Sequence, residues 1–160
     1  MSVTLEQVLA ARENRAATQR RLLGKYGKPL VCLTMNIPGE EKTAPEIARA
    51  FDHGCNALRE SLPIVYEEVL RAETGYEAFF VCDCAAESAK KAAMQIEEAT
   101  PAGRLFDIDV LNEAGEKLSR PEMRKCIICG GPVSVCSRSR AHGLPALEAK
   151  VKELLLEFQT

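Results

Sequence analysis

Two aspartates, Asp107 and Asp109, alternate with apolar residues in the stretch Gly103–Leu111. Side chains on a β-strand point alternately to its two faces, so the two carboxylates are predicted to lie side by side on one face. The other face then turns three apolar side chains towards a core: Phe106, Ile108 and Val110. Two carboxylates about 7 Å apart along a strand repel each other unless a cation lies between them.

Magnesium or manganese is the cation that such a pair would hold, because magnesium prefers oxygen ligands and completes its shell with substrate phosphates. Ions held there would support an in-line displacement at phosphorus. The alternative is an amphipathic strand with a solvated acidic face. Arg104 and Arg120 flank the stretch and favour phosphate chemistry. Asp107 and Asp109 are therefore candidate catalytic and metal-binding residues, with the solvated acidic face left open as the alternative.

Further polar residues that could bind phosphates precede this stretch. Three of them fall at i, i+3 and i+7 on one face of the first predicted helix: Arg12, Arg15 and Gln19. Arginines grip phosphates through paired hydrogen bonds, although such a face is often only solvated. Lys42 ends the loop Asn36-x-Pro38-Gly39-x-x-Lys42, which could bring it to a phosphate but has too few glycines for a P-loop.

A cysteine-containing loop, residues 124–142, carries the residue types of a tetrahedral zinc site: Cys126-x2-Cys129-x6-Cys136-x5-His142. Two glycines follow the first pair and favour a tight turn around both sulfurs. A closed set of four protein ligands would make the zinc structural. The alternative is a loop of reduced thiols that are merely packed.

Hydrophobic periodicity and turn residues predict the elements that must position these side chains. Thr4 and Gln7 form a capping-box pattern that predicts a helix over 4–23, and Thr43 and Glu46 form another before a helix that Pro63 ends. Further helices are predicted over 85–99 and 144–158. The predicted strands are 30–35, 64–71, 76–82, 105–111 and a short return strand over 116–119.

The element order β-α-β-β-α-β is that of the split, ferredoxin-like arrangement. The sequence therefore predicts one α+β domain over residues 1–160, with a mostly antiparallel sheet and flanking N- and C-terminal helices. No internal repeat or linker divides the chain.

Composition excludes several classes of protein. The 160 residues carry 21 Lys and Arg against 23 Asp and Glu, a net charge of −2, and only 5% are aromatic, which argues against nucleic-acid binding. No apolar run approaches the length of a membrane span, and the charged N-terminus lacks a signal-peptide pattern. Seven cysteines, an odd count, fit a reducing compartment. We expect a cytoplasmic protein with no membrane partner.

Taken together, these motifs resemble the holo-citrate lyase synthase family, CitX. The likeness runs from about Leu9 to the last helix. It is carried by Gly103–Leu111 with Ser119-Arg120, by Arg124-x-Cys126-x2-Cys129-x6-Cys136-x-Arg138-x3-His142, by Arg12-x-x-Arg15, by Pro29-Leu30-Val31, by Asn36-x-Pro38-Gly39-x-x-Lys42, and by Phe51-x-x-Gly54-x-x-Ala57-Leu58.

The resemblance implies a nucleotidyltransferase that attaches a prosthetic group. Members of that family take 2′-(5″-triphosphoribosyl)-3′-dephospho-CoA and join its phosphoribosyl-dephospho-CoA part to a serine of the citrate lyase acyl carrier protein, the γ subunit, releasing pyrophosphate. Carried onto this chain, the resemblance makes Asp107 and Asp109 the metal-binding pair. It makes the cationic residues candidates for binding the donor: Arg104, Arg120, Arg12, Arg15 and Lys42.

Two other functions fit parts of the sequence. A non-catalytic, zinc-stabilised binding module would need neither both aspartates nor magnesium. A different metal-dependent nucleotidyltransferase would share the acidic site but act on another acceptor.

Overall fold

The computed structural model describes residues 3–122, 124–131 and 142–158. Its strands are β1 (Leu30–Met35), β2 (Ile64–Ala72), β3 (Gly75–Cys82) and β4 (Phe106–Leu111). Its helices are α1 (Leu5–Tyr26), α2 (Pro45–Ser61), α3 (Ala86–Glu98) and α5 (Leu144–Leu155), with short 3-10 turns η1 (Pro101–Leu105) and η2 (Leu156–Phe158).

The four strands form one sheet in the order β2-β3-β1-β4, and every neighbouring pair is antiparallel. The two strands of each β-α-β unit have one other strand between them: β3 lies between β1 and β2, and β1 lies between β3 and β4. This confirms the predicted α+β class and the split βαββαβ order. The central strand β1 carries β3 on one side and β4 on the other. The acidic stretch is therefore an edge strand next to the centre of the sheet.

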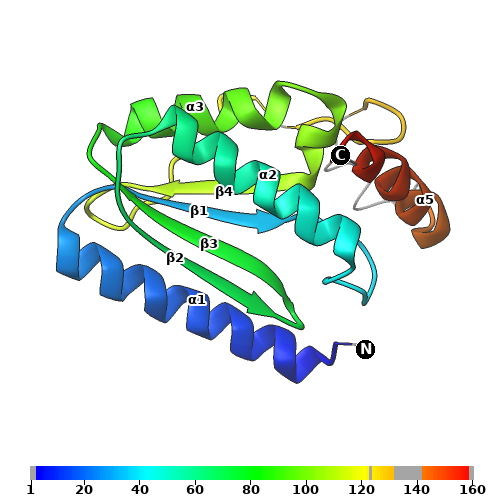
Figure 1. Ribbon diagram of the computed structural model, residues 1–160, viewed down its shortest axis with the longest axis horizontal. Helices are drawn as coiled ribbons and strands as arrows, with labels where there is room; N and C mark the ends of the chain where they lie inside the picture. The colour runs from blue at the N-terminus through cyan, green and yellow to red at the C-terminus, as the bar shows by residue number, and fades with distance from the viewer. Residues whose placement is uncertain (1–2, 123, 132–141, 159–160) are drawn as a thin grey trace.

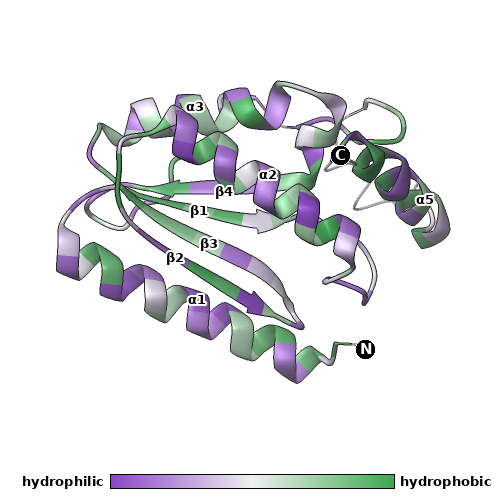
Figure 2. Ribbon diagram, in the orientation of Figure 1, coloured by the Kyte–Doolittle hydropathy of each residue, from purple (hydrophilic) through white to green (hydrophobic). Residues whose placement is uncertain are grey.

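The helices lie in two layers (Figure 1). Helices α2 and α3 cover one face of the sheet and enclose the larger apolar cluster, which includes Phe51, Leu58 and Phe80. Helix α1 lies on the other face, where Leu22 packs in a smaller cluster with residues of the sheet. In Figure 2 hydrophilic and hydrophobic residues alternate along α1, whereas β1 in the middle of the sheet is mostly hydrophobic. The α1 face is therefore the one that keeps polar side chains.

Two helix starts test the predicted capping boxes. At α1, Thr4 Oγ1 accepts from the Gln7 N–H and Gln7 Oε1 accepts from the Thr4 N–H, so that box is confirmed. At α2 the box is wrong, because the cap residue is Ala44 and makes no side-chain cap bond. Thr43 lies one residue too early, and its carbonyl oxygen instead accepts from Tyr76 Oη at 3.2 Å.

The predicted return strand over 116–119 is also wrong. After a turn the chain makes only an isolated bridge between Leu111 and Lys117. The Leu118 N–H still donates to the Val110 carbonyl at 2.9 Å. Beyond it, side chains bind the next backbone groups on this edge of β4: the Ile108 N–H donates to Glu97 Oε2, and Arg124 Nη1 donates to the Phe106 carbonyl, each at 3.0 Å.

Gly103 allows the turn before β4 to pack tightly on the end of α3. A Cβ added there would lie 2.4 Å from the Glu97 carbonyl oxygen and 2.8 Å from that of Ile96, and backbone cannot move aside cheaply. We expect Gly103→Ala to lower the free energy of unfolding by roughly 1–3 kcal/mol, measured by thermal and urea unfolding. Gly24→Ala is the control, because nothing lies within 4 Å of its added Cβ. A Gly103→Ala protein as stable as wild type would contradict this packing.

Candidate functional site

The register of the sheet gathers acidic side chains on the α1 face. Thr34 of β1 pairs with Asp107 of β4 on one side and with Glu77 of β3 on the other, so these three residues form one row across the sheet. Asp109 lies in the next row, opposite Cys32. The residues that alternate with the aspartates are almost completely buried, with exposures of 5%, 1% and 0%, as the sequence predicts: Phe106, Ile108 and Val110.

The two aspartates differ in their surroundings. Asp109 pairs with Lys117 at 3.2 Å, whereas the Asp107 carboxylate has no hydrogen bond or ion pair among the residues that the structure describes. The Asp107 side chain is exposed, yet the protein atoms around it and then the negative charge of Asp109 raise its pKa. Two oxygen donors with too little positive charge between them fit a hard divalent cation such as Mg²⁺ or Mn²⁺.

A pocket of about 240 Å³ opens beside this row. The predicted cations Arg12 and Arg15 of α1 and Lys42 of the β1–α2 loop line it, together with Thr34 and Glu77. The structure thus brings together three cationic side chains from two separate segments of the chain. Thr34 is also the neighbour of Asp107 in the sheet, so the cationic pocket adjoins the acidic strand.

Arg15 is held in this pocket by Glu77. Both Nε and Nη2 of Arg15 donate to Glu77 Oε1, at 3.1 and 2.9 Å. Glu77 is 5% exposed, and its second oxygen, Oε2, is buried with no hydrogen-bond partner within the described part of the chain. Lys42 Nζ donates to the Ile37 carbonyl, and partial burial lowers the Lys42 pKa. Glu77 is a site residue that we did not predict.

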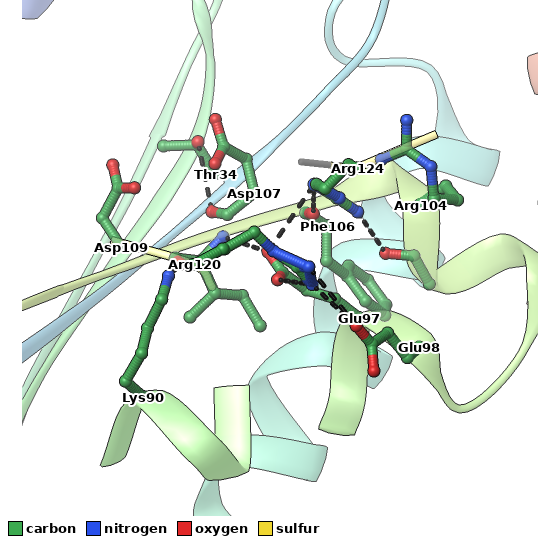
Figure 3. Close-up of polar contacts among 12 residues, drawn as sticks. Thr34, Lys90, Glu97, Glu98, Arg104, Phe106, Asp107, Asp109, Arg120 and Arg124 are labelled. Atoms are coloured by element: carbon green, nitrogen blue, oxygen red, sulfur yellow. Dashed lines mark hydrogen bonds and ion pairs between the residues drawn. The ribbon is translucent and has the colours of Figure 1, made fainter. Parts of the chain in front are cut away.

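The other two predicted arginines lie at the outer edge of β4 and do not line this pocket. Arg120 pairs with Glu97 and Glu98 of α3, both at 3.2 Å (Figure 3). Arg104 donates to the Lys125 carbonyl. Glu97 is 3% exposed, and burial raises its pKa although the Ile108 N–H and nearby arginines oppose that shift.

Arg124 is a second site residue that we did not predict as one. It donates to the carbonyls of Phe106 and Gly103, at 3.0 and 3.3 Å, and pairs with Glu97 at 3.6 Å (Figure 3). Its positive charge also lowers the pKa of Asp107, against the larger effects that raise it. The only feature of the sequence that could have indicated a role for Arg124 is its position two residues before Cys126 in the cysteine motif.

The cysteine loop places three of its four predicted ligands together. One ligand atom from each of Cys126, Cys129 and His142 lies within 4.8 Å of the others. Cys136, the fourth predicted ligand, lies outside the described residues.

No helix in the described ranges is both long enough and apolar enough to span a bilayer.

Comparisons with known proteins identify a family over almost the whole chain. Residues 3–158 match the family model CitX, described as apo-citrate lyase phosphoribosyl-dephospho-CoA transferase. Proteins named probable apo-citrate lyase phosphoribosyl-dephospho-CoA transferase are similar over almost the whole chain. One from Streptococcus pyogenes serotype M5 is 35% identical over 98% of this chain and 88% of its own length. One from Vibrio cholerae serotype O1 (strain M66-2) is 35% identical over 99% of this chain and 94% of its own length.

The chain is also 34% identical to protein CitXG of Haemophilus influenzae, over 95% of this chain and 35% of that longer protein. A family model and relatives of these lengths cover both the acidic strand and the cationic pocket. This chain therefore belongs to the apo-citrate lyase phosphoribosyl-dephospho-CoA transferase family.

Proposed function

We propose that this transferase moves the phosphoribosyl-dephospho-CoA group from 2′-(5″-triphosphoribosyl)-3′-dephospho-CoA to a serine of the apo acyl carrier protein of citrate lyase. The serine oxygen attacks the phosphorus next to the ribose, the bond from that phosphorus to the bridging oxygen breaks, and pyrophosphate leaves. The serine proton goes to solvent or to a nearby carboxylate. The observation that carries the proposal is the acidic pair beside a cationic pocket, in a chain of this family.

The acidic pair supplies the ligands for a divalent cation. Asp107 and Asp109 would hold Mg²⁺ or Mn²⁺, since both are oxygen donors on one face and Asp107 has no ion pair within the described residues. When bound, such an ion makes a hydroxyl easier to deprotonate and offsets the charge of leaving phosphates.

The cationic pocket would hold the triphosphate. Arg12, Arg15 and Lys42 line it, and guanidinium groups bind phosphate oxygens in pairs. Arg15 Nε and Nη2 each donate one hydrogen bond to Glu77 Oε1, which fixes the orientation of the guanidinium. The other N–H groups of Arg15 could then donate to a phosphate. Arg104 and Arg120, at the far edge of β4, remain candidates for the rest of the donor, together with Arg124.

Pyrophosphate release tests the proposed reaction. With wild-type protein, Mg²⁺ and the triphosphoribosyl donor, we expect pyrophosphate to appear only when apo carrier protein is added, and not with a carrier whose acceptor serine is alanine. Release with unrelated carrier proteins but not with the citrate lyase carrier would favour a different nucleotidyltransferase. No release with any carrier, in Mg²⁺ or Mn²⁺, would favour a binding module.

Glu77 is expected to act by positioning Arg15. Glu77→Gln keeps the shape of the side chain but removes the charge that orients the guanidinium, so we expect the KM for the donor to rise severalfold while kcat changes much less. Steady-state kinetics with varied donor measures both. Glu68→Gln is the matched control, because Glu68 binds Arg21 of the same helix at 2.7 Å but does not line the pocket. A severalfold fall in kcat with an unchanged KM for the donor would contradict a positioning role.

A further inference from the structure

We propose that Cys126, Cys129 and His142 bind a structural zinc ion that fastens the segment Arg124–Cys126 to the edge of β4. The inference concerns the cysteine loop alone and does not depend on the transfer reaction. It rests on the positions of the three donor atoms, on the backbone around the first sulfur and on the buried nitrogen of His142.

The donor atoms already lie near the spacing that zinc requires. Atoms that surround a tetrahedral zinc ion, with Zn–S near 2.3 Å and Zn–N near 2.0–2.1 Å, are about 3.3–3.8 Å from one another. The sulfurs of Cys126 and Cys129 and a ring nitrogen of His142 lie within 4.8 Å of one another. Side-chain adjustments of about an ångström would therefore complete the coordination.

The backbone forms a turn around the Cys126 sulfur. The Cys126 N–H donates to the Gly131 carbonyl at 2.7 Å, and the Gly130 N–H donates to the Cys126 carbonyl at 3.0 Å. Gly130 has φ of 74°, a conformation that favours glycine. The Ile128 N–H points to Cys126 Sγ at 3.5 Å, an arrangement that stabilises a thiolate ligand. The turn thus presents both sulfurs of the Cys-x2-Cys pair on one side.

His142 provides an independent observation. Its Nε2 is buried and has no hydrogen-bond partner among the described residues. A buried polar atom without a partner is costly, and coordination to a metal would satisfy it. His142 directly precedes Gly143, the cap residue of α5, so a metal bound there would join the start of α5 to the cysteine turn.

The position of the turn indicates what the ion would stabilise. Arg124, two residues before Cys126, donates to the carbonyls of Phe106 and Gly103, and Arg104 donates to the Lys125 carbonyl. A metal on Cys126 would hold this segment in place along β4, next to Asp107. None of the three ligands lines the pocket of Arg12, Arg15 and Lys42, so the role of the ion would be structural.

Metal analysis of tag-free protein tests the proposal. We expect stoichiometric zinc in wild type and its loss in Cys126→Ser and His142→Asn, with a lower Tm in both variants. Cys84→Ser and His53→Gln are matched controls that should retain zinc, because neither residue belongs to the cluster. Cobalt added to metal-free wild type should give the intense visible absorption of a tetrahedral thiolate site.

Two results would overturn the proposal. One is wild-type protein that is folded yet holds no stoichiometric zinc and gives no thiolate–cobalt absorption, as expected if the thiols are reduced and merely packed. The other is folded Cys126→Ser and His142→Asn protein with zinc content equal to wild type. If either variant does not fold, the cobalt spectrum of the wild type decides, since it needs no substitution.

Discussion

Replacing Asp107 or Asp109 with asparagine is expected to lower the transfer rate by at least about a hundredfold, because charge stabilisation through a bound metal is typically worth several kcal/mol. The change keeps the shape of each side chain and removes one negative ligand. Transfer is measured under single-turnover conditions at limiting Mg²⁺. Asp83→Asn is the control: it removes an exposed carboxylate that follows β3 and pairs with Lys28 at 3.1 Å. Near-normal transfer by both Asp107→Asn and Asp109→Asn would contradict the metal assignment.

Stability separates this loss of activity from a loss of folding. Protein atoms around Asp107 and the charge of Asp109 raise the Asp107 pKa in the folded state, so the charged carboxylate costs stability at pH values above that raised pKa. The cost disappears as the pH falls below the ordinary aspartate pKa of about 3.9. With metal removed, Asp107→Asn should therefore unfold at a temperature equal to or higher than wild type at neutral pH, and the difference should vanish in acid. A much lower Tm at neutral pH would contradict this.

Replacing Arg15 with methionine should produce the second largest effect, a weaker affinity for the donor. Hydrogen bonds to charged groups contribute about 1.5–3 kcal/mol, so we expect the donor Kd to rise by about ten- to a hundredfold. Equilibrium binding of the donor, measured by calorimetry without carrier protein, gives this value. Arg21→Met is the control, since Arg21 lies on the same helix but pairs with Glu68 outside the pocket.

The same variant leaves Glu77 as a buried charge without its partner, which is destabilising. Adding Glu77→Gln should then recover the Tm that Arg15→Met loses, but not the affinity for the donor. Recovery of both together would show that Arg15 acts only through stability, contrary to the proposed phosphate contact.

Local sequence pattern was sufficient for the fold and for the acidic strand. The alternation around Asp107 and Asp109 predicted which side chains are buried, since burial on a strand follows a period of two. The element order β-α-β-β-α-β predicted the antiparallel sheet, because two split β-α-β units allow few strand orders.

Contacts between residues far apart in the chain could not be predicted from local sequence pattern. Glu77 lies near the start of the mostly apolar strand β3, and only the tertiary structure shows that Arg15, 62 residues away, pairs with it. The pairing of residues 116–119 with β4 stops after one bridge, and side chains of Glu97 and Arg124 bind the next backbone groups along that edge, which no local pattern encodes. Arg120 was predicted near the phosphates from its sequence position, whereas its pairing with Glu97 depends on how α3 packs.

The intact mass of the carrier protein tests the central claim most directly. Apo carrier protein is incubated with the triphosphoribosyl donor, Mg²⁺ and either wild-type protein or the Asp107→Asn, Asp109→Asn double variant. The intact mass of the carrier is then measured by mass spectrometry. We expect wild type to add a single phosphoribosyl-dephospho-CoA group at the acceptor serine and the double variant to leave the carrier unmodified. An unmodified carrier with folded wild-type protein, or equal modification by wild type and the double variant, would contradict it.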